Sequence, residues 1–241
     1  MTDEPMKCLL LADDRLDLLA TLEPVLKHWG YRVLTATSIS QTNAFLAESA
    51  PALLIIGSHL LAVPELQLPP TVPVLALEHP QPGQPVAKPD TTLNVPVDIF
   101  TLFSFIQNQV EKHPRRNLRL RLHLPGMYCT NGEDFVLADV LSLSTNGLFF
   151  RSPLKLTCGT QLFAVFPLFG HGKELEVKGT VLYVIEPSPQ NNYVQGFGLG
   201  FAPLSPEQTT LLERFITESF LSEVAACQPG VGEFSTDQLK R

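Results

Sequence analysis

Apolar positions in the first third of the chain follow first a strand pattern and then a helical one. Residues 7–11 form a short apolar run, and apolar side chains then recur at helical spacing over 16–29. Gly30 follows at the place where a helix commonly ends in a left-handed glycine. These positions predict a strand followed by an amphipathic helix.

The same alternation continues over the next thirty residues. A strand is predicted over 31–36, and a helix over 38–49 with Ser38 as its N-cap. Residues 52–56 read ALLII, which is typical of a strand buried on both faces. Strands that alternate with helices in this way predict parallel βαβ units and a doubly wound α/β sheet.

Prolines weaken the pattern over the following segment. Nine prolines lie between Pro64 and Pro96, a density that excludes long helices because proline removes a backbone donor. Only 72–77 is predicted as a strand there. A last helix is predicted from about Asp98 to Lys112.

The second half changes to an alternating pattern. Residues 115–126 read RRNLRLRLHLPG, so every second position is leucine from Leu118 to Leu124, with arginines and a histidine between them. A period of two indicates a strand with one buried face. Five more strands are expected, separated by glycine- and asparagine-containing turns, at 134–142, 147–151, 161–167, 174–186 and 193–202.

Six short strands in about ninety residues favour a closed antiparallel β-barrel. A helix follows the barrel, because Ser205–Gln208 reads as a capping box with proline at the first helical position. We therefore predict an α/β domain over 1–112, a six-stranded barrel with its helix over 113–227, and a flexible tail over 228–241.

Composition and charge argue against several classes of protein. The chain has 241 residues and a net charge of −7, which argues against nucleic-acid binding. It shows no run of about 18 apolar residues and an acidic start, so we expect a cytoplasmic protein without membrane insertion. The four cysteines lack metal-site spacing and are interpreted as reduced thiols.

The basic residues between the two domains need an explanation. Four arginines lie within seven residues, and no acidic residue accompanies them: Arg115, Arg116, Arg119 and Arg121. Two interpretations stay open from the residues alone. The cluster is either an anion-binding site or a solvated basic face that meets an acidic partner.

The first half resembles the receiver domain of response regulators. The matching stretches are LLLADD (9–14), PALLIIG (51–57), PVLALE (73–78) and NVPVD (94–98). In that family an acidic pair holds Mg²⁺, an aspartate ends the third strand and accepts phosphate, and a Thr or Ser and a Lys-Pro end the next two strands. Carboxylates suit Mg²⁺, and the lysine neutralises the phosphoryl charge.

Only the acidic pair survives in this sequence. Asp13 and Asp14 match it, but Gly57 stands in the phosphoacceptor place, Glu78 in the Thr/Ser place and Val95 in the lysine place. The Lys88-Pro89 dipeptide fits the spacing less well. Glycine has no carboxylate to phosphorylate, so the resemblance implies a pseudo-receiver with a degenerate phosphorylation site.

Two features of this pseudo-receiver stay open. Asp13 and Asp14 are either a solvated strand end or a residual metal site. The proline-rich segment also suggests that the third and fourth helices of the family are shortened or absent, which remodels a surface that receivers use for dimerisation. Whether this chain forms a homodimer is left open.

The second half resembles the PilZ domain. Arg115 and Arg119 match its RxxxR motif, and 139–150 (DVLSLSTNGLFF) resembles its (D/N)xSxxG motif. GFGLGF (196–201) and the terminal helix resemble the end of that domain. The resemblance implies cyclic di-GMP as ligand and these ligand-binding residues: Arg115, Arg119, Ser144 and Gly147, with Arg116 as a helper.

The chemistry of the ligand suits these residue types. Cyclic di-GMP carries two phosphates and two guanines. An arginine fork binds a phosphate or the O6 and N7 atoms of guanine, and its flat face stacks on a base. A serine and a glycine on a turn allow backbone N–H groups to approach a ligand closely.

Ser142 departs from the family pattern, since it occupies the Asp/Asn position that reads the guanine edge. Losing one such contact costs about 1–3 kcal/mol, roughly a 5- to 150-fold loss of affinity. The sequence leaves open whether binding survives.

The residues favour a ligand-binding effector over a scaffold, an enzyme or a DNA-binding protein. The leading hypothesis is a cyclic di-GMP effector without catalytic activity or cofactor, which signals by domain reorientation or through an unidentified protein partner. The alternative is a protein-interaction scaffold that has lost both phosphorylation and nucleotide binding. No P-loop, metal-ligand spacing or nucleophile motif favours an enzyme, and no helix-turn-helix favours DNA binding.

Overall fold

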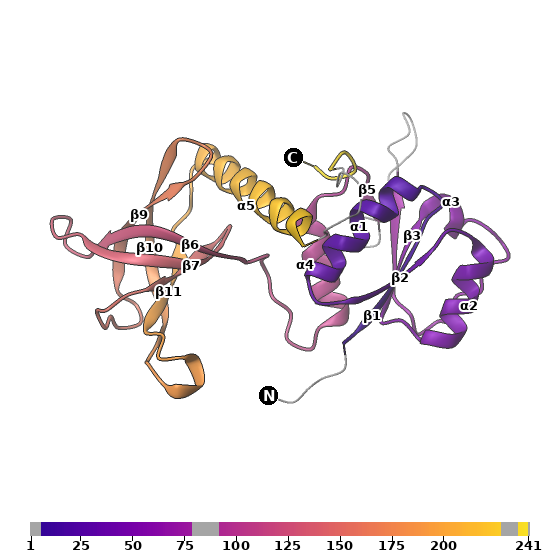
Figure 1. Ribbon diagram of the computed structural model, residues 1–241, viewed down its shortest axis with the longest axis horizontal. Coiled ribbons are helices and arrows are strands. Elements are labelled where there is room, and N and C mark those ends of the chain that lie inside the picture. Colours follow the sequence, from indigo (N-terminus) through magenta and orange to yellow (C-terminus); the bar gives the residue numbers. More distant parts are fainter. Residues whose placement is uncertain (1–5, 79–91, 228–235, 241) are drawn as a thin grey trace. The chain divides into compact units, whose positions relative to one another are not determined.

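The computed structural model describes residues 6–78, 92–227 and 236–240 (Figure 1). The chain forms two compact units. The first comprises Met1–Arg116 together with Leu221–Arg241, and the second comprises Asn117–Phe220. The C-terminal segment therefore returns to the first unit, which a division of the sequence at 112 and 227 does not anticipate.

The first unit is built on a parallel sheet of five strands, in the order β2-β1-β3-β4-β5. Its strands are β1 (Cys8–Ala12), β2 (Arg32–Ala36), β3 (Leu53–Gly57), β4 (Val74–Glu78) and β5 (Thr92–Asn94). The chain reverses its direction of winding between β1 and β3, and in such folds the crevice at the carboxyl ends of these strands is the usual ligand site. The predicted doubly wound sheet is confirmed.

Helices cover both faces of this sheet. They are α1 (Leu16–His28), α2 (Ile39–Ser49), α3 (Ser58–Leu61) and α4 (Ile99–Val110). Even-numbered positions of β1 and β3, such as Leu10 and Leu54, pack in one core with Leu46 of α2 and Leu60 of α3. Helices α1 and α4 pack on the opposite face of the sheet (Figure 1). The caps at Ser38 and Asp98 form as the residue types predict.

The third helix is a single turn. Helix α3 has only four residues, and the segment after it, up to β4, contains no further helix. This agrees with the shortening expected from the prolines. Residues 79–91, which include Lys88 and Pro89, lie outside the described residues.

The second unit is a closed six-stranded barrel in the order β10-β11-β8-β7-β6-β9, with all neighbours antiparallel. Its strands are β6 (Leu120–Cys129), β7 (Val136–Ser144), β8 (Gly147–Arg151), β9 (Gln161–Leu168), β10 (Lys173–Ile185) and β11 (Gly196–Phe201). The single-turn helix η1 (Pro189–Asn191) joins the last two strands. Closure leaves no exposed sheet edge, so every strand has two partners.

Aromatic side chains fill the barrel. Tyr128, Phe150 and Phe197 are fully buried, and each ring meets the other two at centroid distances of 5.1–5.6 Å. The leucines of β6 alternate as predicted, because Leu120 and Leu124 are buried while Arg121 and His123 between them are exposed.

Helix α5 (Pro206–Ala226) follows the barrel and begins at the predicted capping box. The backbone N–H of Gln208 donates to Oγ of Ser205 at 3.2 Å, and the N–H of Ser205 donates back to Oε1 of Gln208 at 3.0 Å. Within the described residues, no helix combines the length and apolar character that crossing a bilayer requires.

Residues 236–240, which lie in the expected tail, pack against the first unit. Leu239 is 3% exposed and forms a parallel bridge with Val97 of the first unit. The side-chain amide of Gln238 also donates to Asp17 at 2.6 Å. One apolar side chain and backbone pairing hold this segment, a contact that polar composition alone does not reveal. Residues 228–235 of the expected tail lie outside the described residues.

A buried ion pair lies at the carboxyl end of β1. Asp13 is 0% exposed, and the guanidinium of Arg15 donates to both of its carboxylate oxygens at 2.6 Å. The backbone N–H of Arg15 adds a third bond at 3.0 Å. This hydrogen bonding to Asp13 raises the pKa of Arg15 above its ordinary value. A carboxylate without such partners would be costly to bury.

We predict that Arg15→Ala destabilises the first unit by about 3 kcal/mol, because it leaves the buried carboxylate of Asp13 without its cation. Urea unfolding of the full chain measures this loss. The chain contains a single tryptophan, Trp29, which packs against Phe103 of the first unit, so its fluorescence follows that unit.

The matched control is Lys27→Ala, which removes an exposed ion pair with Glu23 on the same unit. Surface pairs of this kind contribute about 0.3–0.5 kcal/mol. Equal losses in the two variants would contradict the assigned role of Arg15.

Candidate ligand-binding site

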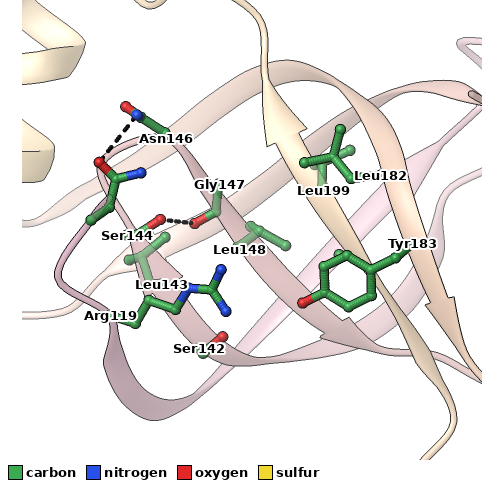
Figure 2. Close-up of a pocket in the computed structure, with 12 residues that line it drawn as sticks. Arg119, Ser142, Leu143, Ser144, Asn146, Gly147, Leu148, Leu182, Tyr183 and Leu199 are labelled. Carbon is green, nitrogen blue, oxygen red and sulfur yellow. Dashed lines mark hydrogen bonds between the residues drawn. The ribbon is translucent and has the colours of Figure 1, made fainter. Parts of the chain in front are cut away.

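A groove on the barrel gathers most of the residues that the second motif singled out. It has a volume of about 130 Å³ and lies where the chain enters β6 beside the β7–β8 hairpin and the strands β10 and β11 (Figure 2). Arg119, Ser142, Ser144 and Gly147 line it, together with Asn117, Leu143, Asn146, Leu148, Leu182, Tyr183, Gly198 and Leu199.

The β7–β8 hairpin forms one wall of the groove. Ser144 pairs with Gly147 across the turn, and its hydroxyl donates to the Gly147 carbonyl at 3.0 Å (Figure 2). A Cβ on Gly147 would collide with the backbone carbonyl of Leu199 in β11. Ser144 and Gly147 therefore fix the shape of this hairpin, and the serine hydroxyl oxygen can still accept a hydrogen bond.

Arg119 is the residue just before β6, and its side chain lines the groove. Its side chain is exposed, and Figure 2 shows the guanidinium above Ser142 on the side that faces Tyr183. Within the part of the chain that the structure describes, no hydrogen bond or ion pair engages this guanidinium. An arginine without an internal partner keeps its donors for an external anion.

The segment that carries Arg119 is held against the hairpin. The side-chain amide of Asn146, at the hairpin tip, donates to the side-chain oxygen of Asn117 at 3.2 Å (Figure 2). Neither asparagine was a sequence candidate, although Asn146 lies inside the second motif. This bond sets the position from which Arg119 leaves the backbone.

Tyr183 supplies a flat surface that the sequence analysis missed. Its ring is 40% exposed and stacks on Phe149 with an interplanar angle of 17° and a centroid distance of 6.3 Å. The register pairs Tyr183 with Gly198, and Gly198 with Phe149. A Cβ on Gly198 would collide with the tyrosine ring, so the glycine allows the ring to lie across β11.

The place of Tyr183 in the groove can be predicted only when the pairing register of the strands is known. A bulge between Val181 and Tyr183 shifts the alternation within β10, so a simple period of two misplaces the side chain. Four other lining residues were likewise not candidates, because leucines at strand positions are usually core residues: Leu143, Leu148, Leu182 and Leu199.

Arg115 and Arg116 do not belong to the unit that holds the groove. Both are grouped with the first unit, where the backbone N–H of Arg115 donates to the side-chain oxygen of Gln107 at 2.9 Å. Both side chains are exposed. The predicted motif is therefore divided, with Arg115 on one unit and Arg119 on the other.

The size of the groove limits what it can enclose. Pockets that bury a drug-sized ligand usually measure about 300–1,000 Å³, and this groove is smaller. It can seat one group the size of a base or a phosphate. A larger ligand would need further groups from outside the groove.

The second candidate site, at the carboxyl ends of β1 and β3, does not suit a metal ion. The fold of the first unit implies Mg²⁺ at the acidic pair, but the Arg15 guanidinium already engages both oxygens of Asp13. Oδ1 of Asp14 lies 2.9 Å from Nε2 of His59. These three acidic and histidine groups lie within 4.8 Å of one another, yet the guanidinium beside them repels a cation.

A glycine stands at the position where a receiver carries its phosphoacceptor. Gly57 ends β3, and a Cβ at this position would lie 2.5 Å from Oδ2 of Asp13 and 2.6 Å from Cε1 of His59. Glu78 ends β4 and Val95 follows β5. The site is thus occupied by side chains of the protein itself.

Several solved structures match part of the chain. Among solved structures, the Bacillus subtilis inhibitor of motility MotI/DgrA matches with 16% identity and a TM-score of 0.39, covering 45% of this chain and 53% of that one. MrkH of K. pneumonia in complex with c-di-GMP matches with 19% identity and a TM-score of 0.42, covering 46% and 54%. This chain spans about half the length of these two proteins.

The PilZ domain of YcgR from Escherichia coli with c-di-GMP matches with 15% identity and a TM-score of 0.39, covering 49% of this chain and 100% of that domain. No curated protein matches the chain. Residues 110–218 match the family model of the PilZ domain. The closed barrel and the terminal helix agree with this match, and the first half has a receiver-like α/β fold.

Proposed function

We propose that this protein is a cyclic di-GMP effector and that the groove on its PilZ domain seats part of the ligand. The observation that carries the proposal is the convergence of Arg119, Ser142 and Ser144 on one groove, with the guanidinium left unengaged by the described residues. The match to the PilZ family supports the same ligand class.

Each group has a defined task in this proposal. Arg119 donates to a phosphate or to the O6 and N7 edge of a guanine. The Tyr183 ring, held against Phe149, offers a face on which a guanine stacks, an interaction of about 1–3 kcal/mol per base. Ser142 and the hairpin backbone complete the polar side of the groove.

Arg115 supplies further contacts to the ligand. The ligand carries two phosphates, and the groove is too small to enclose it. Arg115 and its neighbour Arg116 then bind the part of the ligand that the groove leaves exposed. The pseudo-receiver has no phosphoacceptor, so the nucleotide is the input signal, and a protein partner of the chain receives the output.

We predict that Arg119→Ala weakens cyclic di-GMP binding about 10- to 150-fold, because a charge-assisted hydrogen bond contributes about 1.5–3 kcal/mol. Isothermal calorimetry of the full chain measures the affinity, and the Arg115→Ala/Arg119→Ala double variant should abolish the heat.

The matched control is Arg32→Ala, which removes an exposed arginine of the first unit that belongs to neither motif. If wild-type protein gives no heat at saturating ligand, the effector proposal fails and the scaffold hypothesis replaces it.

We predict that Ser142→Asp tightens binding roughly 5- to 150-fold, because a carboxylate at this position can accept from the N–H groups of a guanine edge. Calorimetry compares it with wild type and with Ser142→Ala, which removes the hydroxyl without adding an acceptor. An Asp variant no tighter than the Ala variant would show that Ser142 does not face a base.

We further propose that ligand binding changes the arrangement of the two units, because their arginines are divided between them. Small-angle scattering of the full chain should then differ with and without saturating cyclic di-GMP, and the double arginine variant should show no difference. Identical wild-type curves at saturation would exclude a reorientation.

A further inference from the structure

A chain of hydrogen bonds inside the first unit ends on the backbone of Arg115. Gln107 of α4 accepts the Arg115 N–H through Oε1 at 2.9 Å and donates through Nε2 to the Tyr31 hydroxyl at 3.0 Å. Tyr31 in turn donates to Oε1 of Glu111 at 3.0 Å. Every member therefore has a fixed role as donor or acceptor.

The two central residues of the network are buried, and a lysine bonds the glutamate at its end. Gln107 is 8% exposed and Tyr31 is 5% exposed. Lys7 donates to Oε2 of Glu111 at 2.7 Å and to the Val110 carbonyl at 2.8 Å. Burial, together with the negative charge of Glu111, raises the pKa of Tyr31 well above its ordinary value. The phenol therefore stays protonated and keeps donating at neutral pH.

These bonds hold the backbone of Arg115 and leave its side chain exposed. Helix α4 ends at Val110, and the four residues after it turn so that the Arg115 N–H meets Gln107. Arg119 follows Arg115 by only four positions, so their Cα atoms lie within about 14 Å of each other. An anchored Arg115 thus restricts where the whole lead-in to the groove can go.

We propose that the Tyr31–Gln107 pair is an anchor by which the pseudo-receiver pre-organises the first arginine of the ligand motif. The inference rests on the proposed binding of cyclic di-GMP by Arg115 and Arg119. A free lead-in would lose backbone freedom when it closes on the ligand, whereas an anchored one has already lost it. The anchor therefore contributes to the affinity by ordering the Arg115 backbone before the ligand binds.

The test uses two variants of the anchor and one control in the full chain. Tyr31→Phe removes one hydroxyl without changing the ring, and Gln107→Leu removes the acceptor of the Arg115 N–H. Tyr128→Phe is the matched control, because it removes a buried tyrosine hydroxyl that bonds Ser152 in the barrel core. Hydrogen exchange of the Arg115 amide and calorimetry with cyclic di-GMP are measured for each protein.

We expect exchange of the Arg115 amide to be about tenfold faster in both anchor variants, and their affinity for cyclic di-GMP to be about fivefold weaker. Tyr128→Phe should change neither. Faster exchange at unchanged affinity would overturn the inference, as would unchanged exchange in both variants. Failure of the proposed function is a separate result, since wild type itself would then give no heat while exchange still reports whether the anchor exists.

Discussion

Close backbone contact between β8, β10 and β11 is the constraint on which the candidate site depends. At Gly147 the carbonyl of Leu199 occupies the space that a side chain would need, and at Gly198 the ring of Tyr183 does. The first contact keeps the β7–β8 hairpin against β11, and the second lets an aromatic ring lie flat on Phe149 beside the groove. A side chain at either position would separate these strands or turn the ring away, so the glycine-rich strand is part of the site although it donates no polar group.

How far the sequence predicts this molecule depends on the range of the interaction involved. The cap at Ser38, the capping box at Ser205 and the leucine alternation of β6 are local, and all three form as predicted. Tyr183 was missed because its place is set by pairing with a distant strand and by a bulge that shifts its alternation. The return of Leu239 to Val97 was missed for the same reason, since it joins residues more than a hundred positions apart.

The carboxyl ends of β1 and β3 show a limit of a different kind. Asp13 and Asp14 were readable as an acidic pair, and Gly57 as an empty acceptor position, because these depend on residue identity alone. The use of Arg15 as the partner of Asp13 depends on a side-chain rotamer that no pattern of residue types specifies. Its consequence is large, since a bidentate guanidinium satisfies a buried carboxylate that would otherwise be unstable and takes the place where a cation would bind.

The division of the arginines between two units bears on how a nucleotide could act as a signal. A ligand shifts a conformational equilibrium only by the difference between its affinities for the two states. If the groove with Arg119 supplied every contact, the affinity would be the same for every arrangement of the units and nothing would be transmitted. On the proposed function, Arg115 adds contacts to those of the groove, and the hydrogen bond from its N–H to Gln107 fixes where its backbone lies within the first unit. The small groove then leaves part of the ligand available for such further contacts, whereas a pocket that enclosed the whole ligand would leave none.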